Sequence, residues 1–137
     1  SMSIKKKCDV EGFEGSITLP DGLTLPEYSR FIEAANEAHK VYSQTGQMPK
    51  LMTAALPGMI PLVEKWDLEN VPEDVSAETW PGTPPIQSMA LYNWLFEAIM
   101  DAYGIPRAKQ EQEPAEPIKD VEATEKEKDS IDTGPES

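Results

Sequence analysis

Residues 83–106 read TPPIQSMALYNWLFEAIMDAYGIP, and this stretch decides the fold. Two prolines near its beginning and a Gly-Ile-Pro sequence at its end are typical boundaries of a helix. Asn93, Glu97 and Asp101 follow one another at intervals of four residues and form one narrow polar line. Almost every other position in the second half of the helix is apolar. Such a helix must be buried on most sides, and a body of about a hundred residues supplies few elements to cover it.

A second helix is predicted over residues 24–45. Thr24 and Glu27 form a capping box around a proline in the first turn, and Gly46 supplies the residue that ends the helix. Polar side chains recur every three or four positions along it. The opposite side holds the apolar residues Leu25, Tyr28, Phe31, Ile32, Ala35, Ala38 and Tyr42. This pattern is typical of an amphipathic surface helix.

Between these two helices, prolines interrupt an apolar stretch. Pro57 and Pro61 each remove a backbone donor, so the sequence predicts two short helices, at about 49–56 and 59–65, with a corner between them. An acidic loop is expected to follow from Trp66 onward. At the other end of the body, residues 9–19 predict a short strand or hairpin arm that ends at a Pro-Asp-Gly turn.

Residues 105–137 differ from the rest of the chain in composition. They contain no aromatic residue, four prolines, ten acids and five bases. Such a segment offers too little apolar surface to offset the entropy of ordering it. The predicted fold class is therefore mainly α. We expect a flexible N-terminus over 1–8, in which Ser1 is a cloning remnant, a small helical domain with a short N-terminal β-strand or hairpin arm over 9–104, and a disordered acidic C-terminal tail over 105–137.

The charge of the chain disfavours some classes of binding partner. The net charge is −13 at pH 7, and residues 1–104 alone hold seven bases and fifteen acids. Such a surface repels phosphate, which disfavours nucleic acid and anionic membranes as partners. Residues 79–96 lack charges but contain prolines and polar residues that do not suit a membrane span. The chain opens without a signal-peptide pattern and has a single cysteine, which favours a cytoplasmic protein.

No group of residues in the sequence forms a recognisable catalytic set. His39 lies on the flank of the first helix and lacks the neighbours of a triad, and Cys8 follows three lysines without a second cysteine. The acidic residues 67–74 lack the glycine and the ligand spacing of a calcium loop. We therefore expect no enzyme activity, no metal and no cofactor.

The surplus of apolar surface on the last helix predicts a partner, either another copy of the chain or a client protein. The residues expected to contact it are Trp66, Trp80, Leu91, Trp94, Leu95 and Ile99. Trp66 and Trp80 flank the acidic loop. Tryptophans in such places either hold a loop against the body or anchor a partner, and the sequence leaves both possibilities open.

The order of these elements resembles a known family. Glu-Gly-Phe-Glu-Gly-Ser followed by LPDGLTLPEY, then LVEKWDLENVPEDVSAETWPGTPP and SMALYNWLFEAI, resembles the tail assembly chaperones of long-tailed, siphovirus-type bacteriophages and prophages. The resemblance covers about residues 9–104. It implies a mainly helical protein of the host bacterial cytoplasm that binds the tape measure protein, keeps it soluble and recruits subunits of the major tail (tube) protein.

Two other classes of function compete with this expectation. An acidic inhibitor that mimics nucleic acid would occupy a basic groove of its partner, and it should display its acids in an ordered row on the folded body. Ten of the twenty-five acids lie instead in the last 33 residues. A small hydrolase would need a pocket with paired acids, and no spacing in the sequence selects such a pair.

Overall fold

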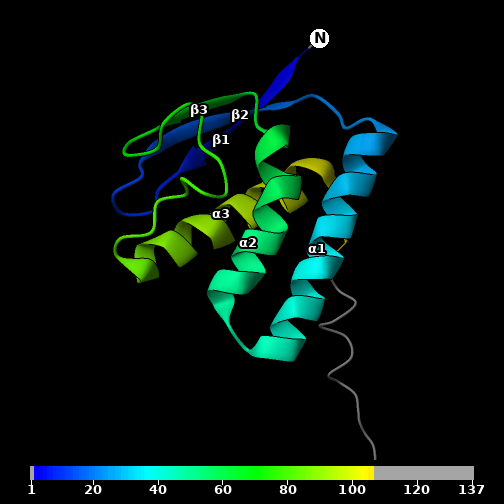
Figure 1. Ribbon diagram of the computed structural model, residues 1–137. Helices are drawn as coiled ribbons and strands as arrows, with labels where there is room; N and C mark the ends of the chain where they lie inside the picture. Colours follow the sequence, from blue (N-terminus) through cyan, green and yellow to red (C-terminus); the bar gives the residue numbers. More distant parts are fainter. Residues whose placement is uncertain (1, 107–137) are drawn as a thin grey trace, which may run out of the picture. The chain divides into compact units, whose positions relative to one another are not determined.

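The computed structural model describes residues 2–106, and its helices and strands lie between Ser3 and Tyr103. Three strands, β1 (Ser3–Cys8), β2 (Gly15–Pro20) and β3 (Lys65–Leu68), form an antiparallel sheet in the order β1-β2-β3. Three α-helices, α1 (Leu25–Thr45), α2 (Met48–Met59) and α3 (Pro85–Tyr103), lie on one side of this sheet (Figure 1). The described part of the chain is therefore mainly helical, as predicted, but its sheet is larger than a hairpin arm.

Alternation of side chains explains which face of the sheet is covered. Ile17 and Leu19 of β2 point toward the helices and are fully buried, and Trp66 pairs with Ile17 on the same face. Lys5 and Lys7 alternate to the other face and are exposed. Because successive side chains of a strand point to opposite faces, one apolar side packs on the helices and one polar side meets water.

The prediction of a flexible N-terminus over 1–8 is wrong for Ser3–Cys8. These residues pair with β2 along their whole length, from Ser3 opposite Pro20 to Cys8 opposite Gly15. The run of three lysines obscured the alternation, because Lys6 lies on the covered side and is paired there with Asp101 of α3. Lysines on an edge strand also hinder pairing with the edges of other sheets.

Gly15 is required where β2 passes between its neighbours. Its φ of +143° is one that residues with side chains rarely adopt, and an added Cβ would lie 2.0 Å from the carbonyl oxygen of Asp67. Gly15 thus permits the close approach of β2 and β3.

The prediction of the first helix is confirmed in detail. The backbone N–H of Glu27 donates to Thr24 Oγ1 at 3.3 Å, and the backbone N–H of Thr24 donates to Glu27 Oε1 at 2.9 Å. This is the reciprocal bonding of a capping box. Gly46, at φ 67°, ends the helix and donates its N–H to the carbonyl oxygen of Tyr42 at 2.7 Å.

The prediction of two short helices at 49–56 and 59–65 is wrong. α2 runs from Met48 to Met59 through Pro57, and a 3₁₀ turn follows at Ile60–Leu62. Pro57 lies in the last turn of α2, where its cost is one lost hydrogen bond, and the burial of Leu56 and Met59 on either side holds the turn in place. Residues 65–68 then form β3 where a loop was expected.

α1 and α2 pack side by side (Figure 1) and are in close contact at Gly58. An added Cβ there would lie 2.5 Å from Ala34 Cβ and 2.9 Å from the carbonyl oxygen of Arg30. The absence of a side chain at Gly58 therefore sets the distance between the two helices.

α3 forms the centre of the core, where the sequence predicted apolar surface left over for a partner. Leu91, Leu95 and Ile99 are fully buried. Phe96 stacks on Phe31 of α1 with ring centroids 5.8 Å apart, which joins the two helices across the core. Exposed positions of α3 include the predicted polar line Asn93, Glu97 and Asp101.

Tyr103, at the end of α3, ties the helix to the sheet. Its hydroxyl donates to the carbonyl oxygen of Pro20 at 2.7 Å. Burial, followed by the charge of nearby acids, raises the pKa of Tyr103 to about 12. The neutral phenol is therefore the form that the folded state stabilises.

Stability is expected to fall at high pH because of Tyr92. Burial raises the pKa of Tyr92 to about 12, whereas tyrosine in an unfolded chain titrates near about 10. The unfolded state thus releases protons first, so the stability from this group is complete below pH 10 and is lost as the pH rises toward 12. Tyr92→Phe should reduce that loss by up to about 2 kcal/mol. Urea unfolding at pH 8 and pH 11.5 measures it, and an equal loss in both proteins would contradict the assignment.

Two further expectations from the sequence concern the acidic tail and a membrane-spanning helix. The predicted acidic tail falls, from residue 107 onward, outside the described residues. Within residues 2–106, no helix is both long enough and apolar enough to cross a membrane.

Candidate partner-binding surface

Four of the six residues predicted to bind a partner belong to the core. Leu91, Leu95 and Ile99 are 0% exposed and Trp66 is 5% exposed. The prediction overestimated the free surface of α3, because β1 and β3, which complete the covering sheet, were not recognised in the sequence. In this fold these four side chains stabilise the body and cannot reach a partner unless the body opens.

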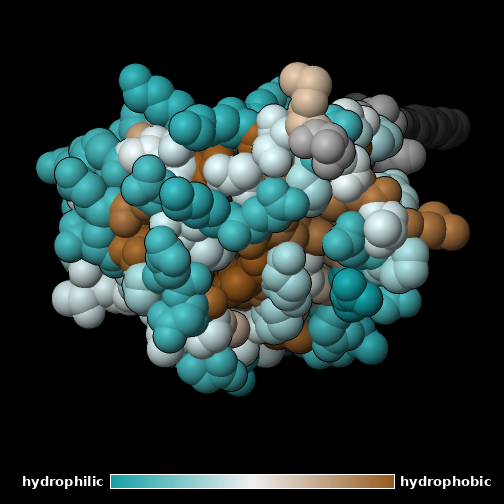
Figure 2. Space-filling model, turned by 90° about the horizontal axis from the view of Figure 1, so that it is seen from above, coloured by the Kyte–Doolittle hydropathy of each residue, from teal (hydrophilic) through white to brown (hydrophobic). Residues whose placement is uncertain are grey.

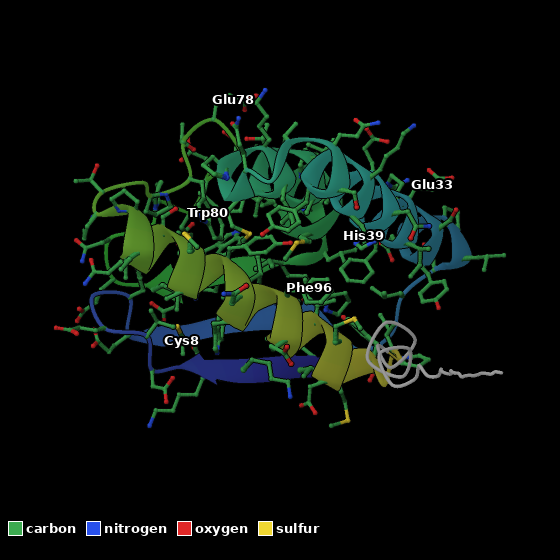
Figure 3. The ribbon with its side chains drawn as sticks, turned by 90° about the horizontal axis from the view of Figure 1, so that it is seen from below. Cys8, Glu33, His39, Glu78, Trp80 and Phe96 are labelled. Carbon is green, nitrogen blue, oxygen red and sulfur yellow. The ribbon has the colours of Figure 1, made fainter. Side chains whose placement is uncertain are left out.

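Trp80 holds the acidic loop against the body. Its indole N–H donates to the carbonyl oxygen of Ser88 in α3 at 3.3 Å, and its ring packs edge-on against Trp66 with centroids 6.0 Å apart. Figure 3 shows Trp80 beside the first half of α3. Of the two possibilities left open by the sequence, Trp66 is a core residue and Trp80 is a half-buried contact that fixes the loop.

The outward side of α3 retains a row of apolar residues. Ile86 is 76% exposed, and Ala90 and Trp94 are half-buried at intervals of four residues along the same side of the helix. We call Ile86, Ala90 and Trp94 the α3 outer row. Of these, only Trp94 was among the predicted site residues. Ile86 was missed, although its spacing of seven from Asn93 places it on the exposed side of the helix.

The part of the chain that carries the α3 outer row is negatively charged. Residues 66–104 contain seven acids and no base. The acids of β3 and the loop that follows it are all exposed, namely Asp67, Glu69, Glu73, Asp74 and Glu78. A partner on this side therefore meets apolar side chains within a field that repels anions.

α1 also exposes apolar residues that the sequence placed in its buried side. Phe31 and Ala38 are buried, but Leu25 is 78%, Tyr28 39% and Tyr42 41% exposed. Figure 2 shows one face of the molecule, on which apolar residues lie uncovered among hydrophilic ones. We call the exposed residues Leu25, Tyr28, His39 and Tyr42, together with the half-buried Ile32 and Ala35, the α1 stripe.

His39 and Cys8 lie on different elements and do not form a common site. Figure 3 shows His39 on α1 and Cys8 on the sheet, well apart from each other. Cys8 is 1% exposed, and burial raises the pKa of its thiol, which disfavours the reactive thiolate. Among the described residues, no cluster of three or more His, Cys, Asp or Glu side chains could hold a metal ion.

The geometry therefore offers two apolar surfaces for contacts with other proteins, the α3 outer row and the α1 stripe. Comparisons with protein-family models, with curated proteins and with solved structures found no match for this chain.

Proposed function

We propose that this protein is a tail assembly chaperone of a long-tailed bacteriophage or prophage, which binds the tape measure protein in the host cytoplasm, keeps it soluble and recruits tail tube subunits. The sequence resemblance suggests this function. The observation that carries it is the α3 outer row, in which Ile86 is exposed and Ala90 and Trp94 are half-buried, on an acidic body. It is suited to holding an apolar helical client without any chemical step.

The spacing of the row suits a helix as its client. Residues at i, i+4 and i+8 form a ridge that fits the groove between side chains of a second helix. Ile86 would be the main anchor, because most of its surface is still available for burial, and Trp94 would add aromatic contact area. Trp80 would contribute indirectly by keeping the loop away from the row.

The acids near the row are expected to affect the solubility of the complex and not the strength of binding. They repel copies of the complex from one another and so favour solubility, while the apolar contacts provide the attraction. Binding should therefore carry a negative heat-capacity change and survive moderate salt, because screening acts on charges and leaves apolar burial almost unchanged.

The test is capture of the tape measure protein by matched variants. Ile86→Ser should weaken binding about tenfold or more, since full burial of an isoleucine side chain contributes roughly 1.5–3 kcal/mol. Leu25→Ser is the control, because Leu25 is 78% exposed against 76% for Ile86 but lies on α1. Co-expression and pulldown, followed by titration calorimetry, compare them. Equal capture by the parent and both variants would refute the role of the row.

A salt titration of the same complex distinguishes the chaperone from an acidic inhibitor that mimics nucleic acid. The exposed acids of residues 67–78 are the feature that favours this alternative. A mimic binds through charge, so its affinity for a basic groove should collapse between roughly 50 and 500 mM salt, as the Debye length shrinks severalfold. Steep weakening, together with binding to unrelated basic proteins, would replace the chaperone proposal with this one.

A further inference from the structure

We propose that the open edge of β1 binds an acidic, extended segment of a partner protein, which adds to the sheet as a fourth strand. β1 lies at one edge of the sheet, and within residues 2–106 no strand pairs with its other side. It has six residues, so an added strand can pair with it over about 20 Å. In this mode of recognition, backbone hydrogen bonds give affinity and side chains give specificity. The inference is independent of the proposed client and of the α3 outer row.

The backbone groups of β1 that face the open edge belong to its exposed lysines. The carbonyl oxygen of Thr18 in β2 accepts the backbone N–H of the residue that precedes β3, at 2.8 Å. Thr18 therefore faces β3, and its neighbour Ile17 faces β1, where it pairs with Lys6. Because these directions alternate along a strand, the N–H and C=O groups of Lys5 and Lys7 point away from β2. They are available to a further strand.

The charge of β1 selects an acidic partner. Residues 2–8 contain three bases and no acid, whereas residues 9–104 contain four bases and fifteen acids. Lys5 and Lys7 are exposed on the face of the sheet that the helices leave open, while Lys6 lies on the covered face and pairs with Asp101. An acidic segment is therefore attracted to this edge and repelled by most of the remaining surface.

Pairing across the strands defines the pattern of the bound segment. Side chains directly opposite each other in neighbouring strands lie on the same face of the sheet, and opposite charges at such positions attract. Acids opposite Lys5 and Lys7 have one residue between them. The residues that alternate with the acids lie on the covered side, beside the half-buried Ile4, where apolar side chains are suited. The segment therefore alternates acidic and apolar residues.

The same lysines disfavour other strands at this edge. If two copies of the chain paired through β1, their two runs of lysine would lie side by side, and like charges in neighbouring strands are destabilising. A neutral strand would gain backbone hydrogen bonds but no charge pairs. The lysines therefore exclude a second copy and favour an acidic strand over a neutral one.

Matched peptides test the proposal on the full chain. The peptide TVEVEVT, blocked at both ends, should bind about tenfold more tightly at low salt than TVQVQVT, because it adds two opposite-charge pairs across the strands. NMR titration measures both affinities. On addition of TVEVEVT, hydrogen exchange should slow at the backbone N–H groups of Lys5 and Lys7 and change little at Lys6, which faces β2. The variant Lys5→Glu/Lys7→Glu should instead prefer TVKVKVT.

Lys65→Glu is the matched control, because Lys65 is exposed on the same face of the sheet and lies in line with Lys5 across β2, but on the other edge strand. Lys5→Glu should weaken binding of TVEVEVT about tenfold. Lys65→Glu removes the same charge roughly 10 Å farther away, about one Debye length, and should weaken binding less than about twofold. Circular dichroism verifies that both variants stay folded.

Three results would overturn the proposal. The first is equal affinity of the parent protein for TVEVEVT and TVQVQVT, which needs no variant. The second is an equal loss of affinity in Lys5→Glu and Lys65→Glu, which would mean general attraction to positive charge. The third is exchange at Lys5 and Lys7 that stays unchanged with peptide, or that slows with rising protein concentration alone, since a second copy would then occupy the edge. Client capture by Ile86→Ser has no bearing on these results.

Discussion

Replacing Gly58 with alanine is expected to lower the free energy of unfolding by about 1–3 kcal/mol, the usual cost of overpacking a well-packed core. In an exposed helix the same change would stabilise by about 0.5–1 kcal/mol. Here the added Cβ would lie 2.5 Å from Ala34 Cβ and 2.9 Å from the carbonyl oxygen of Arg30. The second of these is backbone, so α1 and α2 have to move apart.

Urea or thermal unfolding of three matched variants checks this expectation. Gly22→Ala is the control, since an added Cβ there meets nothing within 4 Å and should change stability little. Ala34→Gly combined with Gly58→Ala should recover part of the loss, because it removes the nearest atom but leaves the carbonyl contact. A Gly58→Ala protein as stable as the parent would mean that the helices cross elsewhere.

Leu95→Ala is expected to cost about 2–5 kcal/mol, which is the range for emptying a buried leucine site. Leu95 is fully buried on α3 between the sheet and the other helices. The sequence alone suggested a contact with a partner at this position, and the two interpretations differ in what they predict. A core residue affects the unfolding of the isolated protein, whereas a contact residue affects binding and leaves unfolding nearly unchanged.

The matched comparison is Ile86→Ala on the same helix. Ile86 is 76% exposed, so its truncation should change stability by less than about 0.5 kcal/mol. Chemical denaturation of the parent and both variants measures the difference. A stable Leu95→Ala protein that fails to capture its client would show that α3 is uncovered in solution.

The helices could be predicted because their signals are local. Thr24 and Glu27 fix the start of α1, and Gly46 fixes its end, all within a few residues of the boundaries. The prolines before α3 and the Gly-Ile-Pro sequence after it predicted the bounds of that helix in the same way. In α2 the local rule for proline failed, because the burial of Leu56 and Met59 on either side of Pro57 outweighed a lost hydrogen bond.

β2 lies within the strand or hairpin arm predicted over residues 9–19, but β1 and β3 were missed because their signals are not local. β1 hides its alternation in three consecutive lysines, and the salt bridge of Lys6 to Asp101 joins residues 95 positions apart. β3 has only four residues, and Trp66 becomes a strand residue through pairing with Ile17. No short stretch of the sequence contains both Lys6 and Asp101, or both Trp66 and Ile17, so local patterns could not reveal these contacts.

The prediction of the site failed for the same reason as that of the sheet. A body without β1 and β3 cannot cover α3, so Leu91, Leu95 and Ile99 seemed to need a partner. With the complete sheet, these residues belong to the core, and the exposed apolar residues are Ile86 and members of the α1 stripe. Burial of a given side depends on the tertiary arrangement, which helical periodicity alone does not specify.

The contact between β2 and the end of α3 has a consequence for synthesis on the ribosome. β1 and β2 are translated before α3, but the helix that covers their apolar face is complete only at Tyr103, whose hydroxyl donates to the carbonyl oxygen of Pro20. Until then the nascent hairpin exposes Ile17 and Leu19 to the crowded cell. The lysines of β1 are already present at that stage. They hinder pairing of the exposed hairpin with strands of other chains before its own helices emerge.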